Sequence, residues 1–186
     1  CNIVCGNSLI DEFEGVPLIN QSKLISTEKN GQLNLGMAEF EPIVKKLIEV
    51  QDELFKCEDT NKKHELLESI NTLKNTICIS QIEDNGKAEK EVIEKYKEST
   101  RMASKPYVLW QIDFARVFRE KGGFDVVIGN PPYVDSEEMT RSMPKLREYY
   151  TSKYETAKGN WDLFVLFIER AYTLADRNGY FSYIVP

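Results

Sequence analysis

The stretch GGFDVVIGNPPYV, residues 122–134, decides the fold class of this 186-residue chain. Its middle, FDVVIGN at residues 124–130, is a continuous and mostly apolar run, which predicts a strand buried on both faces of a parallel sheet. The two glycines before the run break any helix that precedes it. Pro131 and Pro132 then end the strand, because proline cannot donate a hydrogen bond to a neighbouring strand.

The sequence after this strand completes a strand–helix–strand unit. Residues 161–175, WDLFVLFIERAYTLA, predict a strongly apolar helix that Gly179 is expected to stop. Residues 180–185, YFSYIV, predict the next buried strand. A connection of this kind is a right-handed crossover, so the sheet is predicted to be parallel and the fold class to be α/β. Residues 135–160, between the first strand and the helix, are expected to form a polar loop.

The N-terminal part of the chain is mostly helical in pattern. Residues 2–10 predict a short buried strand, and residues 11–36 predict a turn-rich surface loop. From Met37 onward, two apolar stripes joined by a polar turn predict an antiparallel helical hairpin, and a third helix is expected near residues 88–102. The stripes are Ile43, Leu47, Val50 and Leu54, then Leu66, Ile70, Leu73 and Ile77.

These patterns suggest an insertion within a domain. We interpret residues 37–101 as an inserted, coiled-coil-like α-helical arm, and residues 1–36 and 102–186 as parts of one α/β domain. Because the sequence opens and closes on strand-like runs, we also expect it to be a piece of a longer protein.

Composition excludes several classes of protein. A hydrophobic fraction of 41% is typical of a folded globular chain. We expect a cytoplasmic protein, since the sequence shows neither an apolar run that could cross a membrane nor a signal peptide. The four cysteines and the single histidine, His64, do not form a metal-binding pattern, so we expect no metal site and an exposed His64 without a catalytic role.

The charge balance argues mildly against a chain built mainly to hold nucleic acid. The net charge is −6, from 24 basic and 30 acidic residues. Half of the acidic residues lie between Met37 and Arg101, however, and the rest of the chain is nearly neutral. A surface that faces DNA is therefore compatible with the composition.

The residues Asn130, Pro131, Pro132 and Tyr133 stand where a parallel sheet binds its ligands, at the carboxyl end of a strand. The side-chain oxygen of Asn130 and the carbonyl of Pro131 are acceptors, which the two rigid prolines hold close together. Tyr133 offers an aromatic face for stacking. Two acceptors and an aromatic plane suit a planar group with an exocyclic amine, such as adenine. They would localise the lone pair of the amine toward an electrophilic methyl group, without a strong base.

With these residues in place, a resemblance to a known family can be stated. Asn130–Tyr133, NPPY after an apolar strand, resembles the catalytic motif of amino-methyltransferases that use S-adenosylmethionine. The segments around it resemble the adenine-N6 DNA methyltransferase region of type II enzymes that combine restriction and modification. These segments are NIVCGNSLI at residues 2–10, WQIDFARVFREKGGFDVVIGNPPYV at 110–134 and WDLFVLFIERAYTLADRNGYFSYIVP at 161–186.

The resemblance implies a partial Rossmann-like, S-adenosylmethionine-dependent methyltransferase sheet in a restriction–modification enzyme, with double-stranded DNA as partner. The target adenine would be flipped out of the duplex and stacked on Tyr133. Asn130 and the Pro131 carbonyl would bind its amine. Asn7 stands where the family usually has an aspartate that contacts the cofactor's adenine, and the amide loses the charge-assisted part of that bond. Trp161 and Asp162 are candidates for lining the pocket, although capping of the following helix is the favoured role for Asp162.

Some parts of the family pattern are not visible. The sequence shows no glycine-rich cofactor loop of the F-x-G-x-G kind, no target-recognition domain and no nuclease motif. We therefore expect the isolated 186 residues to be inactive, to bind S-adenosylmethionine weakly and to self-associate through exposed strand edges. A glutamine-N5 methyltransferase, an RNA adenine methyltransferase and a non-enzymatic interaction module are the alternatives. The length of sequence before Asn130 and the segment after it favour DNA over a glutamine side chain.

Overall fold

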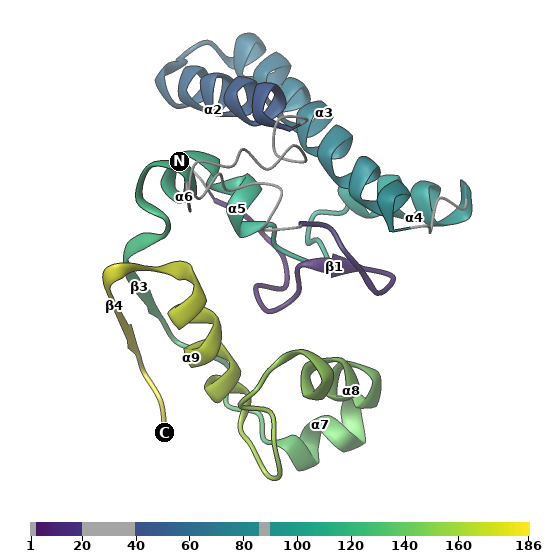
Figure 1. Cartoon of the computed structure of the whole chain (residues 1–186), viewed down its shortest axis with the longest axis vertical. Coiled ribbons are helices and arrows are strands. Elements are labelled where there is room, and N and C mark those ends of the chain that lie inside the picture. The colour runs from purple at the N-terminus through teal and green to yellow at the C-terminus, as the bar shows by residue number, and fades with distance from the viewer. Residues whose placement is uncertain (1–2, 20–39, 86–89) are drawn as a thin grey trace, which may run out of the picture. The chain divides into compact units, whose positions relative to one another are not determined.

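The computed structural model describes residues 3–19, 40–85 and 90–186 (Figure 1). The chain divides into two compact units, Cys1–Arg119 and Glu120–Pro186, and each is described by itself. In the described ranges, none of the helices is both long and apolar enough to cross a membrane.

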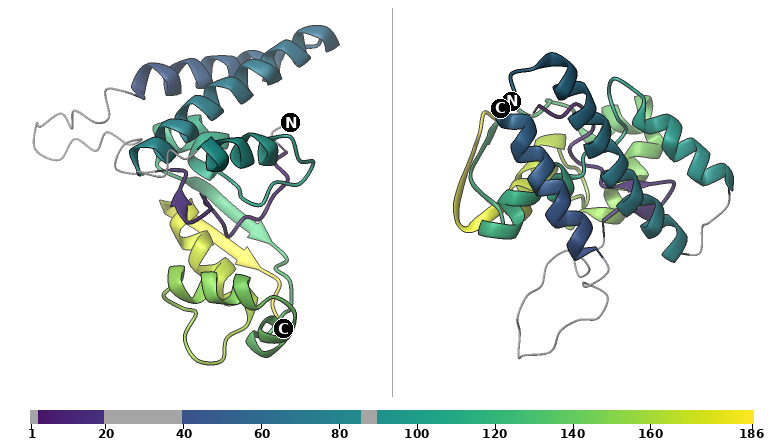
Figure 2. Two further views of the ribbon diagram at one scale, coloured as in Figure 1. Left: turned by 90° about the vertical axis from the view of Figure 1, so that its right-hand side faces the viewer. Right: turned by 90° about the horizontal axis from the view of Figure 1, so that it is seen from above.

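The first unit contains the predicted helical hairpin. Helix α2 (Glu41–Lys56) lies along helix α3 (Thr60–Asp84), as both views in Figure 2 show. Asp59 caps α3, because its side chain accepts a hydrogen bond from the backbone N–H of Lys62 at 2.8 Å. A further helix, α4 (Lys90–Thr100), confirms the third predicted helix. His64 is exposed near the start of α3, as expected.

The hairpin shares its core with the rest of the first unit. Its buried side chains pack with those of a small antiparallel hairpin, β1 (Glu12–Phe13) and β2 (Val16–Pro17), and of the short helices α5 (Trp110–Asp113) and α6 (Ala115–Lys121). Lys74 of α3 forms an ion pair with Asp113, and both side chains are largely buried. Burial also raises the pKa of the Cys78 thiol to about 12, so Cys78 behaves as a core residue rather than a nucleophile.

Of the two predictions for the N-terminal segment, the strand is wrong, and the surface loop lies partly outside the described residues. Residues 3–10 do not form the predicted strand, since their ladder contact with the chain is a single parallel bridge between Gly6 and Lys105. The reason is local, because the Asn7 side chain accepts a hydrogen bond from the N–H of Leu9 at 3.0 Å and so forms a turn that interrupts an extended backbone. Of the predicted surface loop, residues 11–19 hold β1 and β2, and residues 20–36 lie outside the described residues.

The second unit is the predicted strand–helix–strand unit. Strand β3 (Phe124–Gly129) pairs in parallel with strand β4 (Ala175–Tyr183), and helix α9 (Leu163–Leu174) connects them (Figure 1). The helix is strongly apolar, as predicted, and its buried side chains are Leu163, Leu166, Ala171 and Leu174. The chain is thus a mixed α/β structure with a small parallel sheet.

The prediction that Gly179 stops the helix is wrong. Helix α9 ends at Leu174, where Ala175 adopts an extended conformation (φ −72°, ψ 145°) and continues directly into β4. Gly179 has a different purpose. A Cβ atom at this position would lie 2.6 Å from the carbonyl oxygen of Phe124, so glycine permits the close approach of β4 to the start of β3.

The prediction of a polar loop over residues 135–160 is also wrong. The segment contains two helices, α7 (Ser136–Ser142) and α8 (Pro144–Lys153). Asp135 caps α7 by accepting from the N–H of Glu138 at 2.7 Å, and Pro144 begins α8, where its missing N–H costs no hydrogen bond. Met139 and Tyr150 are buried and anchor the two helices.

The prediction that β3 and β4 are buried on both faces is wrong, since the residues of both strands are half-buried or exposed. Helix α9 covers one face, where Phe167 packs edge-on against Tyr183 with ring centroids 6.5 Å apart. The alternate residues point to the other face and are exposed: Val126 (58%), Ile128 (75%), Tyr180 (76%) and Ile184 (65%). We call these four residues the open sheet face. In the described part of the second unit, α9 is the helix that packs on this sheet, which explains the exposure.

Candidate active site

Residues Asn130–Tyr133 directly follow β3 at its carboxyl end, the edge at which parallel sheets bind their ligands. The exit of β4 runs beside it, because the N–H of Ile184 donates to the carbonyl of Gly129 at 3.1 Å. Pro131 is buried, whereas Asn130, Pro132 and Tyr133 are exposed. The buried proline anchors the turn, and the groups on either side of it face solvent.

Asn130 and Tyr133 are joined by a hydrogen bond between their side chains. The Tyr133 hydroxyl donates to Oδ1 of Asn130 at 2.9 Å, and the carbonyl of Ile184 lies 3.4 Å from the same hydroxyl. A carboxamide oxygen has two acceptor positions, so one remains for a ligand. The hydrogen bond therefore fixes the direction of the Asn130 oxygen without consuming its capacity to accept.

The backbone before Asn130 is held by an aromatic side chain that sequence reasoning did not identify. A Cβ atom at Gly129 would lie 2.9 Å from Cε1 of Tyr183, so the ring of Tyr183 covers this glycine. Burial raises the pKa of Tyr183, which remains a neutral phenol. The contact between the Tyr183 ring and Gly129 could not be predicted from the sequence, because it depends on the strand register that places Gly129 opposite Tyr183.

The start of α9 is fastened to the residues that follow Tyr133. The N–H of Leu163 donates to the carbonyl of Val134 at 2.8 Å, and Asp135 and Asp162 form an antiparallel bridge. Asp162 occupies the N-cap position of α9, but its side chain makes no capping hydrogen bond. The prediction that the Asp162 side chain caps this helix is therefore wrong. Trp161 is 6% exposed and belongs to the core of this unit.

A carboxylate from α9 holds the loop between α8 and α9. Glu169 accepts from the backbone N–H groups of Glu155 and Thr156, at 3.1 and 2.9 Å, and from the Thr156 hydroxyl at 2.6 Å. Burial alone would raise the pKa of Glu169, but these hydrogen bonds, with a contribution from Arg170, outweigh it and lower the pKa. Glu169 could not be identified from the sequence, because its partners Glu155 and Thr156 lie in a different segment of the chain.

Asn7, the predicted cofactor residue, belongs to the first unit. Its Oδ1 accepts from the N–H of Leu9 at 3.0 Å, and its own N–H donates to the carbonyl of Lys105 at 3.2 Å. Trp110 fixes the same turn, because its indole Nε1–H donates to the carbonyl of Ser8 at 3.1 Å. The Asn7 side chain is half-buried, and a carboxamide oxygen is the kind of acceptor that a ligand amine requires.

Gly6, next to Asn7, is required by close packing. A Cβ atom there would lie 2.4 Å from the carbonyl oxygen of Tyr107, a distance that no side chain can occupy. The segments on both sides of residues 37–101 are therefore joined at this point within the first unit. The structure groups Asn130, Pro131, Pro132 and Tyr133 in the second unit and places Asn7 in the first.

Comparison with known proteins identifies the family. Residues 18–186 match the family model of the Eco57I restriction-modification methylase. The chain is 43% identical over 63 residues to the type II restriction enzyme and methyltransferase RM.Eco57I of Escherichia coli, covering 34% of this chain and 6% of that protein. It is 41% identical over 64 residues to the type II methyltransferase M.PaeR7I of Pseudomonas aeruginosa, covering 34% and 11%.

A third relative is also a type II methyltransferase. The type II methyltransferase M.BstVI of Geobacillus stearothermophilus is 36% identical over 74 residues, which are 39% of this chain and 12% of that protein. The matched regions are thus about a tenth of the length of these relatives. No solved structure matches the chain significantly. The comparisons confirm the resemblance to type II restriction–modification methyltransferases, and because the family model covers most of the sequence, the chain belongs to the Eco57I restriction-modification methylase family.

Proposed function

We propose that this chain is part of a site-specific DNA methyltransferase that transfers a methyl group from S-adenosylmethionine to N6 of adenine in a restriction–modification system. The observation that carries the proposal is the Asn130 side chain. Its oxygen is exposed at the carboxyl end of β3 and is oriented by the Tyr133 hydroxyl at 2.9 Å. Family membership supports methyl transfer to DNA, and the acceptor chemistry of the site supports the adenine amine as its target.

In this proposal, the chain's own residues bind and orient the amine. The free acceptor position of Asn130 Oδ1 and the carbonyl of Pro131 accept the two amine hydrogens, and Pro131 and Pro132 keep the two acceptors in fixed positions. The adenine amine is a poor nucleophile, since its lone pair is shared with the ring. Two acceptors on its hydrogens favour a pyramidal nitrogen whose lone pair points at the methyl group.

Tyr133 has two roles in the same proposal. Its exposed ring stacks on the adenine, which must be flipped out of the duplex to reach this site. Its hydroxyl holds Asn130 in the orientation that the amine requires. Double-stranded DNA is therefore the proposed partner, and the proposed place of action is the cytoplasm.

S-adenosylmethionine supplies the electrophilic methyl group when it is bound. The Asn7 side-chain oxygen would accept from the amine of the cofactor's adenine, while Leu9 and Lys105 fix the turn that carries Asn7. We further propose the partial Rossmann-like sheet for residues 1–36 and 102–186, with residues 37–101 as an insertion. RM.Eco57I is named as both restriction enzyme and methyltransferase, which supports a fused endonuclease in the whole protein.

The test is methyl transfer by the full-length protein. With methyl-labelled S-adenosylmethionine and mixed-sequence DNA, the wild type should produce N6-methyladenine, and Asn130→Ala should lose turnover by several orders of magnitude while retaining DNA binding. Asn178→Ala, an exposed asparagine of β4, is the matched control and should keep wild-type turnover. Label in RNA or in a glutamine peptide but not in DNA would support the corresponding alternative and overturn the proposal.

A further inference from the structure

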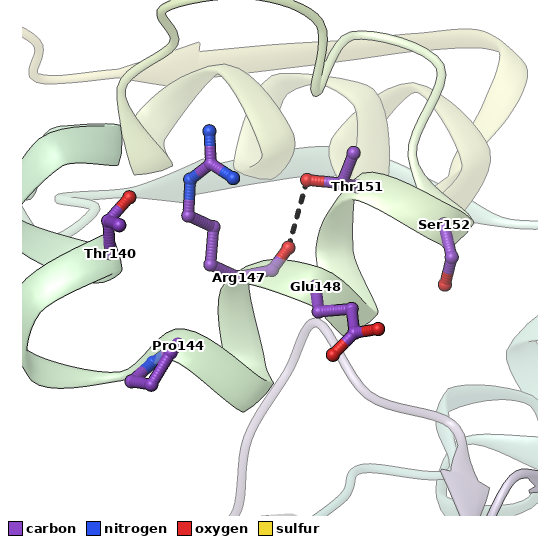
Figure 3. A pocket seen from close by; sticks show the side chains of 6 residues that line it. All are labelled: Thr140, Pro144, Arg147, Glu148, Thr151 and Ser152. Carbon is purple, nitrogen blue, oxygen red and sulfur yellow. Dashed lines mark hydrogen bonds between the residues drawn. The ribbon is translucent and has the colours of Figure 1, made fainter.

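Helices α7 and α8 line an open pocket of about 420 Å³, to which the proposed methyl transfer assigns no role (Figure 3). It lies within the second unit, where α7 and α8 stand beyond the carboxyl ends of β3 and β4 (Figure 1). The side chains that line it come from the end of α7 and from α8: Thr140, Pro144, Arg147, Glu148, Thr151 and Ser152.

Arg147 has an unsatisfied buried donor in this pocket. Its Nε atom is enclosed by protein, and among the described residues it has no hydrogen-bond partner. The guanidinium also forms no ion pair with the carboxylates of the described ranges. Figure 3 shows it extended between Thr140 and Thr151 and pointing away from the Glu148 carboxylate. Buried donors are normally paired, so the unpaired Nε–H indicates that the neighbouring protein groups do not use this guanidinium. The side chain is only half-buried and lines the open pocket, which points to a ligand that supplies acceptors to its accessible N–H groups.

The hydroxyl groups of the pocket do not compete with Arg147 as donors. Thr140 donates to the carbonyl of Ser136 at 2.7 Å, Thr151 to that of Arg147 at 2.9 Å, and Ser152 to that of Tyr149 at 2.7 Å. Their hydrogens are therefore used within the helices. The pocket offers one strong donor group, a planar fork that matches the oxygens of a phosphate.

The place of the pocket in the chain connects it to the candidate active site. Helix α7 begins at Ser136, three residues beyond Tyr133, with Asp135 as its N-cap. The hydrogen bond from the Leu163 N–H to the Val134 carbonyl ties the end of the α7–α8 segment back to the strand exit. A base that reached Asn130 would remain attached to its strand, so its sugar–phosphate backbone would lie near the segment that follows Tyr133. A phosphodiester is thus the anion that would be close to Arg147.

We infer that Arg147 binds a backbone phosphate of the DNA beside the target base. This inference rests on the proposed function and deepens it, because it assigns one residue to the sequence-independent part of DNA binding. A bidentate guanidinium–phosphate contact releases condensed counterions, so its loss has a defined effect on the salt dependence of affinity. It carries no sequence information, so that effect is the same for every DNA sequence.

The experiment measures DNA affinity of the full-length protein over a series of salt concentrations, with duplexes that do and do not contain the methylation site. Arg147→Met, which keeps the length of the side chain, should reduce the slope of log affinity against log salt by ~0.9. It should also weaken binding to both duplexes on the order of tenfold. The turnover at saturating DNA should stay at the wild-type value, so that the change appears in KM for DNA.

Two further variants make the outcome decisive. Arg147→Lys keeps the charge but loses the fork, so it should keep the wild-type slope and still bind several-fold more weakly; wild-type affinity of this variant would overturn the inference. Arg141→Met removes an exposed cation of α7 outside the pocket and should leave the slope unchanged. An equal loss of slope in Arg141→Met and Arg147→Met would mean that helices α7 and α8 act through their overall charge, which would also overturn the inference about Arg147.

The failure of this inference differs from the failure of the proposed function. An active wild type whose slope equals that of Arg147→Met overturns the Arg147 assignment alone, as does a loss of affinity confined to the duplex with the methylation site. A wild type that binds DNA with the expected dependence on Arg147 but methylates no adenine overturns the proposed function and supports the phosphate contact. A wild type that binds no DNA overturns both.

Discussion

The hydroxyl of Tyr133 donates a hydrogen bond to Oδ1 of Asn130, over 2.9 Å, at the carboxyl end of β3. Two residues separate the partners, and both are prolines, so the backbone between them has little freedom to change this distance. The ring of Tyr133 remains 54% exposed while its hydroxyl is engaged. One side chain thus offers a flat surface and at the same time orients its neighbour.

This pairing predicts different losses for two substitutions of Tyr133. Tyr133→Phe keeps the ring but releases the Asn130 side chain, so we expect kcat to fall by about fivefold, the equivalent of one ordinary hydrogen bond of about 1 kcal/mol. Tyr133→Ala also removes the stacking surface, which is worth roughly 1–3 kcal/mol, so kcat should fall by a further factor of about five to one hundred or more. Single-turnover rates with labelled cofactor measure both. Equal losses in the two variants would assign the whole effect to the hydroxyl.

A second prediction concerns the glycine before Asn130. In Gly129→Ala, the new Cβ atom meets the Tyr183 ring at 2.9 Å, so either the ring or the strand end must move. We expect lower methyl transfer and a loss of stability of about 1–3 kcal/mol, as for other overpacked positions. The double variant Gly129→Ala with Tyr183→Leu makes room for the methyl group and should recover part of the activity. Thermal unfolding and turnover are the measurements, and the absence of any recovery would count against the contact as the cause.

How far the sequence predicted this site depends on the kind of information each element needs. The parallel pairing of β3 and β4, the apolar helix between them and the position of Asn130 follow from periodicity and from the two prolines, which are local signals. The hydrogen bond to Tyr133 and the cover of Gly129 by Tyr183 depend on rotamers and on strand register, which local patterns do not contain. The methyltransferase roles of these residues remain predictions.

The errors in the sequence-based fold also have physical causes. Helices α7 and α8 are short and strongly polar, so they lack the apolar stripe that reveals longer helices, although the cap Asp135 and the initiating Pro144 were visible. Gly179 was interpreted as a helix stop because glycine commonly serves that role, whereas here it relieves a contact with Phe124 from the neighbouring strand.

The Asn7 position predicts a gain of affinity. Asn7→Asp restores the residue that the family usually has, and a carboxylate can still accept from the Leu9 N–H that fixes the turn. We expect S-adenosylmethionine to bind the full-length protein several-fold more tightly, on the order of 1 kcal/mol. Asn7→Ala should bind it more weakly and loosen the turn. Equilibrium dialysis with labelled cofactor measures both, and unchanged affinity in both variants would remove Asn7 from the cofactor site.

The clamp formed by Glu169 predicts a pH dependence of stability. Because hydrogen bonds from Thr156 and Glu155 lower the folded-state pKa of Glu169 below its ordinary value of 4.5, the ionised form stabilises the folded chain. This contribution is fully present above about pH 4.5 and is lost as the pH falls through the lowered pKa. Glu169→Gln should therefore reduce the free energy of unfolding by about 1 kcal/mol at pH 7. The difference from wild type should shrink in acid; a difference that grows in acid would show that the sign is wrong.

The last prediction concerns the open sheet face of Val126, Ile128, Tyr180 and Ile184. These side chains are between 58% and 76% exposed. Val126, Ile128 and Tyr180 lie on the paired strands β3 and β4, and Ile184 directly follows β4. Exposed apolar surface of this kind promotes association. We expect the isolated 186-residue chain to form oligomers at micromolar concentration and to show no methyl transfer.

Replacing Ile128 and Tyr180 by threonine places β-branched residues, which favour strands, at both positions and removes the two most exposed apolar side chains of the open sheet face. This double variant should shift the chain toward the monomer in sedimentation velocity. Tyr172→Thr is the matched control, because Tyr172 is 78% exposed on α9 and lies outside the open sheet face. Equal association of the double variant and the wild type would show that another surface drives it, and methylation of DNA by the isolated chain would show that these residues suffice for activity.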